Sequence, residues 1–169
     1  MRVLKNSLLA SLAAVMSIAS FNAFADDDDW RAMQRSKIDA AQAIVIATDK
    51  VGGQAVELDF DEDDGRGYYK IEVYTKNKEY ELKVDANSGR VVESDVDRER
   101  DMRTNVGISL QRAIQIAERE TQAKTKTAEL KNRGSRDSYY EVDTIRRDTD
   151  YEVRIDANDG KILKIERDD

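Results

Sequence analysis

The 169-residue chain contains no cysteine and no histidine. It therefore lacks Ser-His-Asp and Cys-His nucleophile systems, thiol redox chemistry, disulfides and the His or Cys ligands of ordinary zinc sites. What remains is carboxylate, hydroxyl, amine or backbone chemistry, or a hard cation held by oxygen atoms. A catalytic pair of carboxylates needs a cleft in which the two groups have different proton affinities. The small helix-on-sheet units predicted below suggest no such cleft, so we expect no enzyme activity.

Acidic residues outnumber basic residues. The whole chain has 28 Lys and Arg and 35 Asp and Glu. Without residues 1–25, which include Arg2 and Lys5 but no acid, 26 basic and 35 acidic residues remain, a net charge of −9. This balance disfavours a nucleic-acid partner, because phosphate binding depends on an excess of Lys and Arg.

Residues 1–25 have the pattern of a secretory signal peptide. Arg2 and Lys5 precede an apolar stretch from Leu8 to Ile18, and the segment ends in Ala23-Phe24-Ala25, a small-x-small cleavage site. We expect cleavage after Ala25; an uncleaved N-terminal anchor is the alternative. No later segment is apolar enough to span a bilayer, so we expect a soluble exported protein, periplasmic and without membrane insertion after cleavage.

The remaining chain repeats itself at an offset of 70 to 71 residues. Ile38–Ile44 aligns with Ile108–Ile114, and Val84–Gly89 aligns with Ile155–Gly160. Such a repeat predicts two copies of one structural unit. The predicted units are 36–95 and 106–167, joined by the charged linker 96–105.

Each unit is expected to begin with a helix. Asp39 and Ser109 are good N-caps, and Gln42 completes a capping box in the first unit. Apolar residues then recur at helical spacing in both units. The first helix is expected to end at Gly52-Gly53 and the second, which has no such glycine, to fray near Ala123.

Alternating apolar and charged residues then predict strands. Short gaps between them favour an antiparallel meander. The expected fold is α+β, with two tandem units that each pack one helix on a small antiparallel β-meander. Since about 60 residues make a marginal unit, the two copies should pack together or extend one sheet through the pair. The predicted strands are Val56–Phe60, Tyr69–Val73 and Tyr80–Val84, then Thr127–Leu130, Tyr140–Thr144 and Tyr151–Ile155.

This arrangement resembles the PepSY domain family. The resemblance rests on Ala43-Ile44, Tyr69–Val73 and Val84–Val91, and on a second set at Ala113-Ile114, Tyr140–Val142 and Ile155–Ile162. It implies an exported or membrane-associated α+β module, as found in propeptides of secreted metallopeptidases and in small free-standing envelope proteins. The role proposed for the family is to bind and restrain peptidases, although here no peptidase is attached.

The Asp-Ala-Asn segment that closes each unit invites a calcium interpretation. In an EF-hand loop the glycine is sixth, whereas here it is fifth, and strands rather than helices flank it. We interpret these residues as structural turns, in which Asp and Asn bond to nearby backbone and Gly supplies a positive φ. The turn residues are Asp85, Asn87, Gly89, Asp156, Asn158 and Gly160.

Acidic residues cluster at the tip between the first two predicted strands. Oxygen ligands suit Ca²⁺ or Mg²⁺, so weak binding of either is one hypothesis, and a hydrated loop is the other. At the equivalent tip of the second unit stand Arg133, Arg136 and Asp137, so a cation site would belong to the first unit only. We expect no other cofactor. The candidate metal ligands are Asp61, Glu62, Asp63 and Asp64.

Three tyrosines are candidate protein-binding residues. Tyr68 and Tyr139 precede the predicted core residues Tyr69 and Tyr140, so they face the opposite side of the sheet, and Tyr74 shares the parity of Tyr68. An outward tyrosine suits recognition because it combines apolar area with a polar tip. Cross-strand packing against the neighbouring unit is the alternative.

These observations favour a non-enzymatic periplasmic protein that binds an envelope protein, for example a peptidase that it restrains. The alternative is a binding module of an envelope signalling system that responds to a small ligand or a divalent cation. A structural role in the envelope is a third interpretation.

Overall fold

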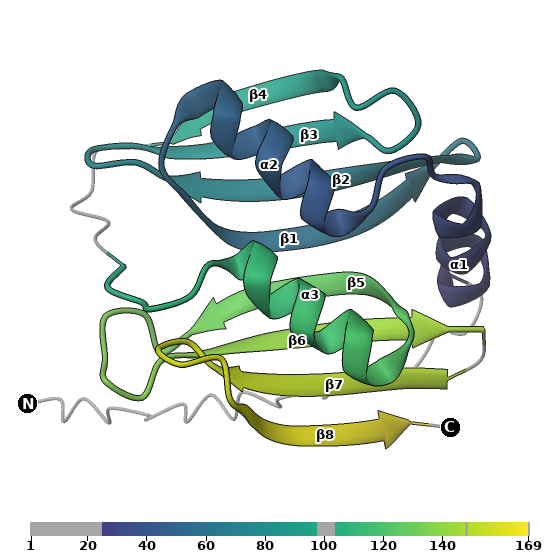
Figure 1. The fold of residues 1–169 in the computed structure, drawn as a ribbon. Helices are drawn as coiled ribbons and strands as arrows, with labels where there is room; N and C mark the ends of the chain where they lie inside the picture. The colour runs from purple at the N-terminus through teal and green to yellow at the C-terminus, as the bar shows by residue number, and fades with distance from the viewer. Residues whose placement is uncertain (1–24, 98–103, 148, 169) are drawn as a thin grey trace, which may run out of the picture.

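The computed structural model describes residues 25–97, 104–147 and 149–168, and these contain three helices and eight strands (Figure 1). The predicted signal peptide lies outside the described residues apart from Ala25, and so do residues 98–103 of the predicted linker. The elements are α1 (Ala25–Arg35), α2 (Ala40–Val51), β1 (Gln54–Asp63), β2 (Arg66–Tyr74), β3 (Glu79–Asp85), β4 (Val91–Asp97), α3 (Leu110–Thr121), β5 (Lys124–Lys131), β6 (Tyr139–Arg146), β7 (Thr149–Asp156) and β8 (Ile162–Asp168).

The two equivalent helices, α2 and α3, begin at the predicted caps. Asp39 Oδ1 accepts a hydrogen bond from the Gln42 amide at 2.7 Å, and the Gln42 side chain accepts one from the Asp39 amide at 2.9 Å. Ser109 Oγ accepts from the Arg112 amide at 3.2 Å. Helix α2 ends at Gly52, whose φ is 72°, while α3 ends at Gln122 in the left-handed region. Short-range sequence signals thus set both helices.

A buried tyrosine ties each helix to the second strand of its unit. The Tyr69 hydroxyl donates to the Ile38 carbonyl at 3.2 Å, and the Tyr140 hydroxyl donates to the Ile108 carbonyl at 2.8 Å. Both carbonyls belong to the residue before the N-cap. Burial raises the pKa of both tyrosines, that of Tyr140 to about 12, so the hydroxyls remain protonated donors.

All eight strands form one antiparallel sheet in the order β4-β3-β2-β1-β5-β6-β7-β8. The prediction of two tandem helix-on-meander units is therefore wrong, although the α+β class holds. The two units merge into one sheet because β1 pairs with β5. The structure also adds a fourth strand to each unit and a helix, α1, before the first unit. A separate four-stranded unit would leave the backbone groups of its first strand unpaired and bury less apolar surface.

The junction between β1 and β5 is symmetric. Leu58 pairs with Ala128, and the two positions correspond to each other in the repeat, as their pairing with β2 and β6 shows. Glu57 lies opposite Glu129, and Asp59 lies opposite Thr127. In the repeat Glu57 corresponds to Thr127 and Asp59 to Glu129, so the symmetry converts one pair into the other. The two units are thus related by a local two-fold axis that passes between Leu58 and Ala128 perpendicular to the sheet.

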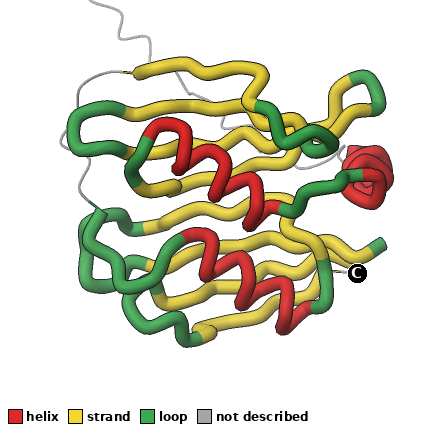
Figure 2. Tube along the Cα trace, turned by 45° about the horizontal axis from the view of Figure 1, so that its top comes forward, coloured by secondary structure: helices red, strands yellow, loops and turns green. Residues whose placement is uncertain are grey.

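Helices α2 and α3 lie side by side on one face of the sheet, and Figure 2 shows the same two-layer arrangement after a turn of the view. The core lies between these helices and the sheet, and α1 packs at one end of it. Met33 of α1 is 1% exposed, and its carbonyl accepts a hydrogen bond from Lys124 Nζ at 2.7 Å. We call the side of the sheet opposite α2 and α3 the open face.

The first prediction concerns the junction. Leu58 has no exposed surface, so Leu58→Ala should lower the free energy of unfolding by about 2–5 kcal/mol through lost burial and a residual cavity. Because both units share the sheet, Trp30 fluorescence and far-UV circular dichroism should report one urea transition. Val92→Ala, at a side chain 50% exposed, is the control and should change stability by less than about 0.5 kcal/mol. Two separate transitions would contradict the shared sheet.

Candidate functional site

The open face is occupied by charged side chains and tyrosines. They alternate along each strand with the apolar residues that face the helices, as the strand registers show. Residues of this face include Glu57, Asp59 and Asp61 of β1, Tyr68, Lys70, Glu72 and Tyr74 of β2, Glu81 and Lys83 of β3, Thr127, Glu129 and Lys131 of β5, Tyr139, Glu141 and Asp143 of β6, Glu152 and Arg154 of β7, and Lys164 and Glu166 of β8.

Arg133, in the loop after β5, lies over the junction of the two units. Its guanidinium is 3.5 Å from Glu57, 3.4 Å from Glu72 and 3.8 Å from Glu129. It also contacts the Tyr74 hydroxyl and lies 5.1 Å from the centre of that ring. One cation of the second unit thus bridges two carboxylates of the first and one of its own. The sequence indicates Arg133 only as a replacement for an acidic residue, because nothing local predicts contacts with residues 59 to 76 positions away.

Three carboxyl groups at or near the junction hold protons more tightly than usual. Burial raises the pKa of Glu57, and repulsion from Glu72 and Glu129 raises it further. Burial also raises the pKa of Asp59 and of Asp143. These three groups therefore take up protons at a higher pH than ordinary carboxyl groups do.

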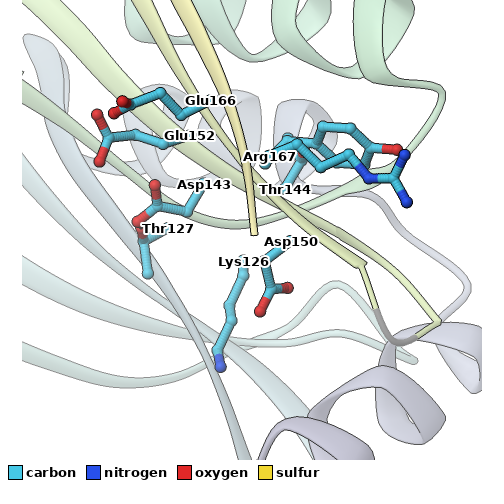
Figure 3. Close-up of a pocket in the computed structure, with 9 residues that line it drawn as sticks. Lys126, Thr127, Asp143, Thr144, Asp150, Glu152, Glu166 and Arg167 are labelled. Atoms are coloured by element: carbon cyan, nitrogen blue, oxygen red, sulfur yellow. The ribbon is translucent and has the colours of Figure 1, made fainter. Parts of the chain in front are cut away.

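A hollow of about 680 Å³ lies beside the junction, in the second unit (Figure 3). Thr127 lines it and donates from Oγ1 to Asp143 Oδ2 at 2.7 Å. Four carboxylates and two cations contribute to the lining, so the hollow suits a positively charged or hydrogen-bond-donating group. These charged residues are Asp143, Asp150, Glu152 and Glu166, with Lys126 and Arg167.

The three candidate tyrosines lie on the open face, but the fold does not bring them together. Lys83 Nζ lies 4.4 Å from the centre of the Tyr68 ring, and the Arg154 guanidinium 5.8 Å from that of Tyr139. Tyr68 and Tyr139 are half-buried and lie at opposite ends of the sheet, because the two units are antiparallel. Tyr74 is only 8% exposed, since Arg133 covers it.

The acidic tip holds its charges in local pairs. Asp61 forms a salt bridge with Lys70 at 2.8 Å, and Asp63 lies 3.9 Å from Lys83. Glu62 accepts a hydrogen bond from the Gly65 amide, and Asp64 has a φ of 50° in the turn. Among the described residues, no group of three or more acidic side chains is placed to hold a metal ion.

The repeated Asp-Ala-Asn segments form turns after β3 and β7. Asp85 Oδ1 accepts from the amides of Asn87 at 3.1 Å and Ser88 at 2.7 Å. In the second unit, Asp156 Oδ1 accepts from the amide of Asn158 at 2.7 Å. Gly89 and Gly160 have φ values of 69° and 77°, a region in which glycine is favoured.

The described part of the chain offers no candidate for a membrane-spanning helix, since each helix is too short or too polar. The described residues form a duplicated α+β fold, and one face of its sheet carries charged and aromatic side chains. The chain belongs to the PepSY family: the model of this family, described as peptidase propeptide and YPEB domain, matches residues 37–95 and 107–166. PepSY domains are propeptide and regulatory modules, generally non-catalytic.

The chain is also similar to individual proteins. It is 29% identical over 154 residues to the uncharacterized protein YkoJ of Bacillus subtilis (strain 168), covering 89% of this chain and 88% of YkoJ. The crystal structure of CD1622 from Clostridium difficile 630 matches 80% of this chain and 97% of that one, at 25% identity and a TM-score of 0.49. The YpeB C-terminal domain of Bacillus megaterium matches 81% of this chain and 68% of that one, at 18% identity and a TM-score of 0.31.

The second prediction concerns Arg133. Arg133→Ala should lower the free energy of unfolding by about 1 kcal/mol at neutral pH, because the three carboxylates it bridges then repel one another. The loss should shrink in acid, because the raised pKa of Glu57 lets this carboxylate take up a proton there. Urea unfolding at pH 7 and pH 4 measures both values. The control Arg136→Ala, at an exposed position of the same loop, should have little effect; an equal loss in both variants would contradict the bridge.

The third prediction concerns Asp143. Because burial raises its folded-state pKa above the ordinary 3.8, the folded protein binds a proton at a pH where the unfolded chain does not. The wild type should therefore gain stability relative to Asp143→Asn as the pH falls from 7 towards 4, and lose it as the pH rises. Urea unfolding of both proteins across this range gives the difference. Asp137→Asn, at an exposed site, should show no such trend; a reversed slope for Asp143→Asn would refute the assignment.

Proposed function

We propose that this protein acts in the bacterial periplasm, where it binds another envelope protein through the open face of its sheet and restrains a peptidase. The observation that carries the proposal is the open face itself: charged and tyrosine side chains run across both units, on the side opposite α2 and α3. Membership of a family described as peptidase propeptide supports the class of partner. The signal pattern of residues 1–25 supports export.

The proposed mechanism is surface complementarity without a covalent step. The carboxylates of the hollow pair with basic side chains of the partner, and the net charge of −9 beyond residue 25 steers a basic surface towards the protein. Tyr68 and Tyr139 supply contact area at the two ends of the face. Such binding should weaken as the salt concentration rises.

A second candidate is a module of an envelope signalling system that responds to a small cationic ligand. The hollow favours it, because four carboxylates outnumber two cations there and Asp143 has a raised pKa. Thermal unfolding with candidate amines or divalent cations separates the two functions. A rise in the unfolding temperature that Asp143→Asn abolishes, with no protein partner captured, would favour the ligand.

The fourth prediction tests the proposed partner. The exported protein is immobilised and exposed to envelope extract, and captured proteins are identified and assayed for peptidase activity. Tyr68→Ala and Tyr139→Ala should each weaken capture about tenfold, because a tyrosine at an interface often contributes more than 1 kcal/mol. Tyr80→Ala is the matched control, since Tyr80 packs partly against the core on the helix side. A captured peptidase whose activity is unchanged by the protein would refute restraint.

A further inference from the structure

Strand β8 is one of the two outer strands of the sheet (Figure 1). Among the described residues, only β7 pairs with it, so one side of its backbone has no strand neighbour. Leu163 is 54% exposed and Ile165 47% exposed on this strand. An edge of this kind is a template for pairing with another strand.

The charges of β8 on the open face lie beside like charges of β7. Lys164 is opposite Arg154, and Glu166 is opposite Glu152. Within the strand, Lys164 Nζ and Glu166 Oε1 form an ion pair at 2.5 Å. A strand on the free side that presents an acid beside Lys164 and a base beside Glu166 would offset the like-charge neighbours.

A second copy of β8 presents that order of charges. Directly opposite residues of an antiparallel pair lie on the same face, so two identical strands pair about one central residue. With Ile165 at the centre, Lys164 lies opposite Glu166 of the second copy, and Glu166 opposite its Lys164. The two Ile165 side chains then contact each other on the helix side. Registers centred on Lys164 or Glu166 instead place like charges opposite each other.

Two copies of β4, the equivalent edge strand of the first unit, could not pair in this way. On β4, Glu93 and Asp95 occupy the places of Lys164 and Glu166, and Ser94 the place of Ile165. Two copies centred on Ser94 would place Glu93 against Asp95 twice. Val92 and Val96 are as exposed as the apolar residues of β8, so the two edges differ in their charges and in the central residue rather than in the amount of exposed apolar surface.

We propose that the protein forms a homodimer in which β8 pairs antiparallel with β8 of a second copy, centred on Ile165. The chain already joins its two units in this way, since β1 and β5 pair antiparallel about a local two-fold axis. An axis perpendicular to the sheet keeps both open faces on the same side. The dimer therefore has one continuous sheet, and its open face is twice as large as that of one copy.

The fifth prediction is tested by sedimentation velocity on the exported protein, from micromolar to millimolar concentration. The wild type should form dimers and no larger species. Lys164→Glu and Glu166→Lys should each raise the dimer dissociation constant about tenfold or more, because two attractive pairs become repulsive. The double swap Lys164→Glu/Glu166→Lys restores the opposite charges across the axis and should restore the dimer.

Ile165→Lys should also prevent the dimer, and Ser94→Lys, at the equivalent place on β4, is its matched control and should leave it intact. Circular dichroism establishes that each variant is folded. A wild type that stays monomeric at millimolar concentration would overturn the proposal, as would a dimer that survives Ile165→Lys. Growth into species beyond a dimer would overturn it as well, since it would indicate pairing of β4 with β8.

Discussion

Pairing of β1 with β5 joins the two repeats, and the remaining architecture depends on it. Leu58 and Ala128 meet at the local axis with no exposed surface, and α2 and α3 lie side by side above them. A unit of about 60 residues buries too small a fraction of its surface to be more than marginally stable. Sharing one sheet gives both units a neighbour along their first strand and a continuous core.

The same pairing creates the electrostatics of the open face. It places Glu57 opposite Glu129, and like charges directly opposite each other destabilise a sheet. Arg133 offsets this repulsion by reaching across the junction, yet burial and the neighbouring acids still raise the pKa of Glu57. Neither unit has this arrangement by itself, because its members come from both repeats.

The repeats keep their interior and differ on their surface. Tyr69 and Tyr140 make the same hydrogen bond to the residue before the N-cap, which anchors each helix in the same way. In contrast, the acidic tip after β1 has no counterpart after β5, and the acidic edge of β4 corresponds to a mixed-charge edge on β8. A two-fold scaffold thus carries an asymmetric surface, and function is a property of such a surface rather than of the fold.

Local features followed from the sequence. The caps at Asp39 and Ser109 and the outward parity of Tyr68 and Tyr139 depend on residues within a few positions of one another. The repeat and the PepSY resemblance follow from short motifs that recur along the chain, and the family match confirms the resemblance. The turn at Gly89 has the same local origin, since Asp85 bonds to the backbone two and three residues further on.

What the tertiary structure alone decided involves residues distant in the chain. The single sheet depends on the pairing of β1 with β5 at Leu58 and Ala128. The position of α1 depends on a hydrogen bond from Lys124 Nζ to the Met33 carbonyl. Tyr74 is covered because Arg133, 59 residues away, lies over it. Periodicity shows which face a side chain occupies, but it cannot show which strand will be its neighbour, because the free energy of pairing two edges depends on the whole surface that both then bury.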